Sequence, residues 1–209
     1  MSDSFDRHSL DRLTFFSDAV FAIAMTLLVV EVRLPDVARP FSEVALANAL
    51  LGLIPQYVGF VISFFVVGRF WVGHHRFFAR LARSDDMLVS LNLLLLLTIA
   101  FMPFPTTLIS HFIDSRVGVG VYAGWLVLAG IANVLLERHA VRAGLARPEA
   151  AAEVRRLARG GWAPVAVGVL AFGAAMIAPL LALIPLGLSP VIVRLIAPPP
   201  RKPKALPPA

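Results

Sequence analysis

The sequence has no cysteine among its 209 residues and few charged side chains, which make up 15% of the chain. Without cysteine, neither disulfide bonds nor thiolate metal sites are available to the fold. Soluble domains typically contain about 25% charged residues, so the low charge excludes an ordinary soluble protein. Hydrophobic residues supply 58% of the chain, and the mean hydropathy is +0.81. Several apolar segments approach the roughly 20 residues that cross a bilayer, which predicts a polytopic membrane protein.

Other sequence signals are missing as well. The polar start of the chain, Met1 to Leu10, lacks the basic and apolar regions of a signal peptide, so we expect the first apolar segment to remain in the mature protein. No Gly-x-Ser-x-Gly or His-Glu-x-x-His pattern occurs, and we do not expect an enzyme. The net charge of +6 comes without a basic stripe or an aromatic-basic motif, so it indicates basic loops of a membrane protein rather than nucleic-acid binding.

The apolar segments predict an all-α protein with six transmembrane helices. Their expected ranges are 13–34, 50–72, 87–109, 117–137, 162–179 and 182–197. The last two are short and rich in Pro and Gly, so they could instead form a broken hairpin, or one crossing and a re-entrant piece. Residues 1–197 then form a single membrane domain, with a helical extension over the basic linker 138–160. The Pro-rich basic tail, 198–209, is expected to be disordered.

The basic residues predict the orientation of this chain in the membrane. Six crossings place Arg33, Arg39 and Arg116 on one side and all other Lys and Arg residues, of 19 in total, on the opposite side. Because cytoplasmic loops carry the excess of Lys and Arg, we expect both termini to be cytoplasmic. Two cytoplasmic termini require an even number of crossings, and six satisfies this condition.

The first apolar segment, from Arg12 to Pro35, carries polar groups that a lipid-facing helix would not. Asp18 is the most unusual of them, because a carboxylate in a membrane helix costs about 2.5–3.5 kcal/mol on insertion scales. A rotation of 100° per residue gathers one stripe along this helix, with Thr26 at its edge. The stripe consists of Arg12, Phe16, Ala19, Ile23, Leu27, Val30 and Leu34.

Two interpretations of this stripe remain open from periodicity alone. It can face lipid or a neighbouring helix, as most aliphatic stripes do. It can also face a pore axis, where rings of branched aliphatic side chains gate by dewetting. In both cases Ser17 and Asp18 lie well off the stripe and are available to hold the helix against its own subunit.

The residues of this helix resemble the signature of a known channel family. The pattern Arg12-x-x-x-Phe16-Ser17-Asp18, followed by Ala-Val-Phe-Ala-Ile-Ala-Met-Thr-Leu-Leu, is similar to the R-x-x-x-F-S-D first helix of the endosomal/lysosomal potassium channel (transmembrane protein 175) family. The likeness continues through Trp71-x-x-His74-His75, then Asn92 and the stretch Phe-Met-Pro-Phe-Pro at 101–105. We therefore identify the chain as resembling a bacterial member of that family.

This resemblance implies a potassium-permeable cation channel made of four six-helix subunits in a bacterial inner membrane. The first helix of each subunit would line the pore, without a carbonyl filter and without any cofactor. Ile23 matches the constriction of the family, Leu27 and Val30 continue it, and Thr26 matches a position linked to ion selectivity. The motif Arg12, Phe16, Ser17 and Asp18 would be structural. Its Phe-Ser-Asp part would pack against polar residues of the second and third helices.

The candidates for that packing are Trp71, His74, His75 and Asn92. Adjacent histidines point about 100° apart on a helix and cannot both face one ion without help, so we do not expect a metal site. We expect His74 or His75, with Trp71 and Asn92, to hydrogen-bond Asp18 or Ser17. Arg12 is expected to pair with a carboxylate such as Asp11.

Three further expectations concern individual carboxylates. Glu31 is expected either to pair with Arg33 or to attract cations at the outer mouth. Asp85 is a candidate cap of the third helix. A different functional class also remains open, namely a small cation- or proton-coupled secondary transporter that uses Asp18. A transporter would place its carboxylate near a broken helix or an inverted repeat, whereas Asp18 lies in an apparently unbroken helix.

Overall fold

A computed structural model describes residues 2–33, 35, 42–189 and 192, and its regular elements are helices. Within these ranges the chain forms no strand, only an isolated antiparallel bridge between Leu81 and Ala146. The helices are α1 (Ser2–Leu27), α2 (Glu43–Leu51), α3 (Ile54–Phe78), α4 (Asp86–Ala100), α5 (Pro103–His111), α6 (Arg116–Arg142), α7 (Ala151–Gly160), α8 (Ala163–Ile177) and α9 (Leu183–Gly187). Short 3-10 turns cover Leu28–Glu31, Pro148–Ala150 and Pro179–Ala182.

Five described segments are long and apolar enough to cross a membrane, which confirms the all-helical polytopic class. They are His8–Glu31, Ile54–Phe78, Asp86–His111, Arg116–Arg142 and Pro148–Ile177. The sixth expected segment, 182–197, begins with α9 and then continues into residues outside the described ranges. The sixth crossing therefore stays a prediction, as does the tail 198–209, which also lies outside them.

Several helix boundaries differ from those expected. The first helix begins at Ser2 instead of residue 13, because polar residues continue the helix beyond its apolar part. The expected helix 87–109 is divided between α4 and α5, since Pro103 has no N–H to donate to the preceding turn. The unexpected α2 is capped by Ser42, whose hydroxyl accepts from the Ala45 N–H at 3.1 Å.

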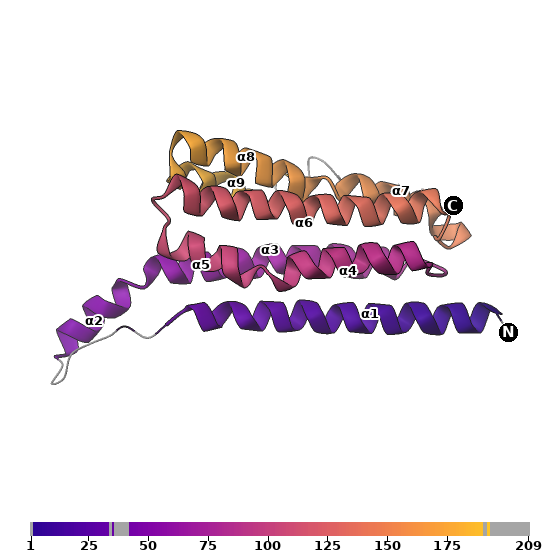
Figure 1. The fold of residues 1–209 in the computed structure, drawn as a ribbon, viewed down its shortest axis with the longest axis horizontal. Coiled ribbons are helices and arrows are strands. Elements are labelled where there is room, and N and C mark those ends of the chain that lie inside the picture. Colours follow the sequence, from indigo (N-terminus) through magenta and orange to yellow (C-terminus); the bar gives the residue numbers. More distant parts are fainter. Residues whose placement is uncertain (1, 34, 36–41, 190–191, 193–209) are drawn as a thin grey trace, which may run out of the picture.

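The helices form three layers (Figure 1). On one side α1 runs alone and packs on α3 and α4, which with α5 make the middle layer. The third layer contains α6 and α8, together with α7 and α9, and α6 packs on both α4 and α8. Helices α6 and α8 lie so close together at Gly130 that a Cβ atom on this residue would come within 2.8 Å of the Val165 backbone nitrogen. Small residues of this kind let membrane helices pack backbone against backbone.

At one end of the bundle the α3–α4 loop is bonded to the loop that follows α6. The N–H of Ala82 donates to the carbonyl of Leu145 at 2.8 Å, and the N–H of Arg147 donates to the carbonyl of Arg80 at 3.0 Å. Gly144 lies in the turn that follows α6 and has a φ of +63°, a backbone conformation that is unfavourable for residues with a side chain. These bonds connect the middle layer to the third layer.

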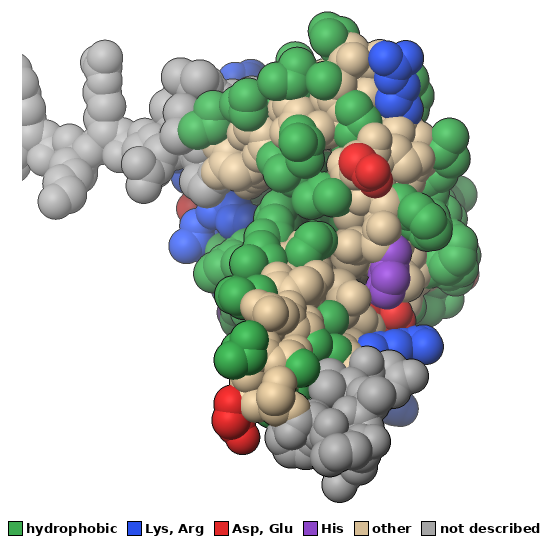
Figure 2. All heavy atoms as spheres, turned by 90° about the vertical axis from the view of Figure 1, so that its left-hand side faces the viewer, with side chains coloured by type: hydrophobic (Ala, Val, Ile, Leu, Met, Phe, Trp, Pro, Cys, Tyr) green, Lys and Arg blue, Asp and Glu red, His purple; other side chains and the backbone are tan. Residues whose placement is uncertain are grey.

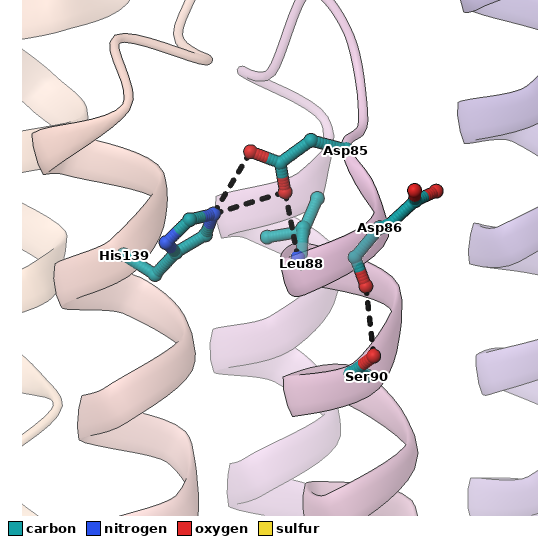
Figure 3. A network of polar contacts seen from close by, with 5 residues as sticks. All are labelled: Asp85, Asp86, Leu88, Ser90 and His139. Atoms are coloured by element: carbon teal, nitrogen blue, oxygen red, sulfur yellow. Dashed lines mark hydrogen bonds and ion pairs between the residues drawn. The ribbon is translucent and has the colours of Figure 1, made fainter.

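Asp85 adds a charged contact at the same place (Figure 3). Its side chain caps α4, as expected, by accepting from the Leu88 N–H at 2.7 Å. Both carboxylate oxygens lie 2.9 Å from Nε2 of His139 on α6. Burial alone would raise the pKa of Asp85, but the bonds from Leu88 and His139 stabilise the carboxylate and hold its pKa below the ordinary value of 3.8.

Replacing Asp85 by Ala should lower the free energy of unfolding by about 1 kcal/mol, because α4 loses its N-cap. Asp85→Asn keeps a capping oxygen and removes only the charge, so its effect should be smaller. Because the folded-state pKa lies below 3.8, the contribution of the charge is present above that pH and is lost as the pH falls further. Detergent-solubilised native protein and Asp85→Asn, compared by unfolding from neutral pH to about pH 3, should therefore converge in acid. A difference in stability that persists unchanged at the acid end would contradict this assignment.

Candidate pore-lining helix and its anchor

One face of α1 and of the 3-10 turn that follows it is not covered by the part of the chain that the structure describes. The exposed fractions are 50% for Phe16, 58% for Ile23, 45% for Leu27 and 63% for Val30. Arg12, Ala19 and Thr26 are exposed on the same side of the helix, while Leu34 lies outside the described residues. The stripe expected from the helical period is therefore exposed along its described length.

The opposite face of α1 is buried against α3 and α4. Its buried residues, spaced three, four or seven apart, are Leu10, Ser17, Phe21, Ala24 and Leu28. Spacings of this kind put side chains on one side of a helix. Since α1 contacts α3 and α4 along this side, the rotation of α1 about its own axis is set by the side chains of α3 and α4 that these residues contact.

Ser17 takes part in a chain of buried hydrogen bonds that links α1, α4 and α3. The Asn92 Nδ2 group on α4 donates to Ser17 Oγ at 2.9 Å, and Asn92 Oδ1 lies 2.8 Å from His74 Nε2 on α3. An amide oxygen only accepts, so His74 carries its proton on Nε2. Ser17 and Asn92 are fully buried and His74 is 1% exposed. A single amide thus joins three helices where no water is available.

The histidine of this chain is also held by aromatic rings. The ring of His74 stacks on Phe78 with a centroid distance of 4.0 Å and lies 5.5 Å from Phe21 of α1. Packing on both sides restricts the imidazole to one orientation. It therefore presents Nε2 to Asn92 in a fixed direction.

Asp18 is held by a second, more exposed contact. The indole Nε1 of Trp71 donates to Asp18 Oδ1 at 2.8 Å, and His75 Nδ1 lies 3.9 Å from Asp18 Oδ2. The side chains of Asp18 and His75 are 31% and 53% exposed, so this contact lies at the edge of the subunit. The two neighbouring histidines thus take part in different contacts, one buried with Asn92 and one beside Asp18.

The structure differs from other sequence expectations for α1. Phe16 does not pack against α3 and α4 but is half exposed, because it lies on the stripe rather than on the buried face. Within the described residues Arg12 forms no ion pair with Asp11, and Arg33 forms none with Glu31. Thr26 Oγ1 donates to the Ile23 carbonyl of its own helix at 2.8 Å.

A further polar contact in the middle of the bundle was not anticipated from the sequence. Thr106 Oγ1 on α5 lies 2.8 Å from Ser63 Oγ on α3, which lies 3.2 Å from the Tyr122 hydroxyl on α6. Ser63 and Tyr122 are isolated polar side chains in apolar segments, which was the available signal, whereas Thr106 stands beside Thr107. All three are buried, so they join the middle and third layers as Asn92 joins the first and middle layers.

Comparison with known proteins identifies the family of this arrangement. A family model described as the endosomal/lysosomal potassium channel TMEM175 matches residues 12–103. A potassium channel of Chamaesiphon minutus is 38% identical over 146 residues, which are 68% of this chain and 71% of that protein. A potassium channel of Streptomyces collinus is 38% identical over 137 residues, covering 64% of this chain and 65% of the relative.

The fold also matches a solved structure. The crystal structure of a lysosomal potassium-selective channel TMEM175 homolog from Chamaesiphon minutus superimposes with a TM-score of 0.79 at 31% sequence identity. The match covers 92% of this chain and 100% of that chain. This chain therefore belongs to the family of the endosomal/lysosomal potassium channel TMEM175.

Proposed function

We propose that this protein is a potassium-permeable cation channel in which α1 helices from four copies line a shared pore. The observation that carries the proposal is the exposed aliphatic stripe of α1, opposite a face whose polar groups are tied to α3 and α4. The names of the two bacterial relatives, both potassium channels, support potassium as the permeant ion. One stripe on one subunit cannot enclose an axis, whereas copies around a closed cyclic symmetry can.

The constriction in this proposal is a ring of Ile23 side chains, continued by Leu27 and Val30. Branched aliphatic rings gate by excluding water when the pore narrows. Thr26 lies beside this ring, and its hydroxyl oxygen remains exposed while its proton is bonded to the helix backbone. Selectivity in this arrangement comes from the constriction and the Thr26 ring, without a carbonyl filter.

The proposed setting is a bacterial inner membrane with both termini on the cytoplasmic side. The supporting observation is the excess of Lys and Arg in the loops at the end of the bundle where α3 ends and α7 begins. Arg12 lies toward the same end of α1, and Arg33 and Arg116 lie toward the opposite end.

Ile23→Asn should increase potassium flux and reduce discrimination against other monovalent cations, because the amide keeps water in the constriction. The measurement is ion flux into liposomes that contain purified protein, under a potassium gradient. Ile131→Asn is the matched control, since Ile131 on α6 is 41% exposed but lies in the layer farthest from α1. This control should leave flux unchanged.

Two outcomes would overturn the pore assignment. One is an equal effect of Ile23→Asn and Ile131→Asn on potassium flux, which would show that Ile23 does not form the constriction. The other is native protein that moves potassium only with a coupled proton or substrate gradient, which would favour a carrier that uses Asp18.

The buried chain of hydrogen bonds is proposed to hold α1 in the orientation that the pore needs. Asn92→Leu keeps a similar volume but leaves the His74 Nε2–H without its acceptor and removes the bond that Ser17 Oγ accepts, so that Ser17 keeps only its own bond to the Leu13 carbonyl at 2.8 Å. It should reduce the free energy of unfolding in detergent by about 1–3 kcal/mol. Ser90→Ala, an exposed change on the same helix, should remain within about 0.5 kcal/mol of native. A loss no larger for Asn92→Leu than for Ser90→Ala would refute the proposed role.

Asp18 is proposed to act in assembly through its bond from Trp71. Asp18→Ala and Trp71→Phe both remove this bond, so both should reduce the tetramer fraction in size-exclusion chromatography with light scattering. Asp11→Ala removes an exposed carboxylate of the same helix and should leave the tetramer intact. Stable Asp18→Ala tetramers with an altered ion preference would contradict this assignment and place Asp18 in the conduction path.

A further inference from the structure

The exposed face of α6 changes from aliphatic to basic near its end. Side chains three to seven residues apart line this face, with exposed fractions between 40% and 51%: Val121, Leu128, Ile131 and Leu135. The next exposed positions at the same spacing are Arg138 and Arg142. A change of this kind on one helix face is expected where the hydrocarbon of a bilayer ends.

The neighbouring segment of α7 and α8 shows the same change at the same level. Arg155 and Arg159 are exposed and four residues apart, and Trp162 follows three residues later with 45% exposure. Beyond it the exposed side chains of α8 are apolar, beginning with Val169 and Leu170. The Arg138 guanidinium lies 5.9 Å from the centroid of the Trp162 ring, which brings the two basic stripes together.

These residues form one surface, the arginine patch, defined as Arg138, Arg142, Arg155, Arg159 and Trp162. Within the part of the chain that the structure describes, none of its arginines forms an ion pair with a carboxylate. Of the nearby acids, Glu153 pairs with Arg80 at 2.7 Å and Glu137 is 4% exposed, buried against Gly161. Glu149 is exposed in the turn before α7, so among the described residues nearby the four arginines stand against one exposed, unpaired carboxylate. The patch therefore carries uncompensated positive charge.

The position of the patch leaves it open to the membrane. It lies in the third layer, on the far side of the bundle from α1, so an assembly around α1 does not cover it (Figure 1). The opposite end of the bundle shows mainly hydrophobic side chains, with Lys and Arg in a few separate places (Figure 2). Among the described residues, basic side chains thus gather beside the aliphatic stripes at the end where α6 ends and α7 begins.

We propose that the arginine patch binds the phosphate headgroup of an anionic phospholipid. Guanidinium groups donate paired hydrogen bonds to phosphate oxygens, and the patch supplies four of them from two helices that pack on each other. Trp162 then lies at the level of the lipid interface, where indole rings concentrate in membrane proteins. The acyl chains follow the aliphatic stripes of α6 and α8. The site is independent of whether the chain conducts ions.

The test compares phosphatidylglycerol with phosphatidylcholine of identical acyl chains. Purified full-length protein in an uncharged detergent is titrated with each lipid, and retained lipid is counted by native mass spectrometry. Native protein should prefer phosphatidylglycerol. Arg138→Gln combined with Arg159→Gln should weaken that binding by about 25-fold, since each basic residue near a membrane surface contributes about fivefold.

The matched control removes the same charge at the same end of the bundle. Arg76→Gln with Arg83→Gln lies outside the patch, on α3 and its following loop, and should keep the preference. If the first pair does not fold, Arg142→Gln with Arg155→Gln leaves the Arg138–Trp162 contact intact and should give the same loss. Equal binding of the two lipids by native protein, or an equal loss in patch and control variants, would overturn the proposal.

Discussion

The structure depends on one constraint, which is that α1 must satisfy its polar groups within the subunit while one of its faces stays free. Inside a membrane an unpaired hydroxyl or amide has no water with which to form a hydrogen bond. The Asn92 amide resolves this by donating to Ser17 and accepting from His74. A rotation of α1 by one residue, about 100°, would break that bond and bury part of the apolar stripe. The direction of the stripe is therefore a consequence of the buried bonds.

The same principle arranges the rest of the bundle. Thr106, Ser63 and Tyr122 join the middle layer to the third layer through a buried polar contact, as Asn92 does for α1. Close contact at Gly130 then holds α8 against α6 by packing alone. The result is a bundle whose two outer surfaces are both apolar at mid-height. One of them belongs to α1 and is the proposed pore face, and the other belongs to α6 and α8 and is the proposed lipid face.

The features that depend on local periodicity could be predicted from the sequence, whereas contacts between distant residues were anticipated only where the resemblance to the channel family indicated them. The α1 stripe follows from the helical period, and the Asp85 cap follows from its place before an apolar run. For Phe16 the helical period placed the side chain on the stripe whereas the motif implied packing against the second and third helices, and its 50% exposure agrees with the period. The division at Pro103 was overlooked since the apolar run from Leu93 dominates the hydropathy. The expected bonds of Ser17 and Asp18 to Asn92 and Trp71 are present, with His74 bonded to Asn92. No local pattern could have indicated them, because these residues are far apart in the chain, and the expectation came from the resemblance to the channel family.

The two outer surfaces also show why composition alone cannot separate a pore face from a lipid face. Ile23 and Leu27 are of the same type and similar exposure as Leu128 and Ile131. The two proposed roles place different demands on the helices. A helix that only faces lipid tolerates rotation, because fluid hydrocarbon adapts to any apolar surface. A helix that forms a constriction would not, since a small rotation would replace Ile23 in the proposed ring by another side chain. The bonds of Ser17 and Asp18 hold α1 in the rotation that the proposed pore requires. Bonds of Tyr122 and Trp125 hold α6 in the same manner, so anchoring by polar side chains does not by itself separate the two faces either.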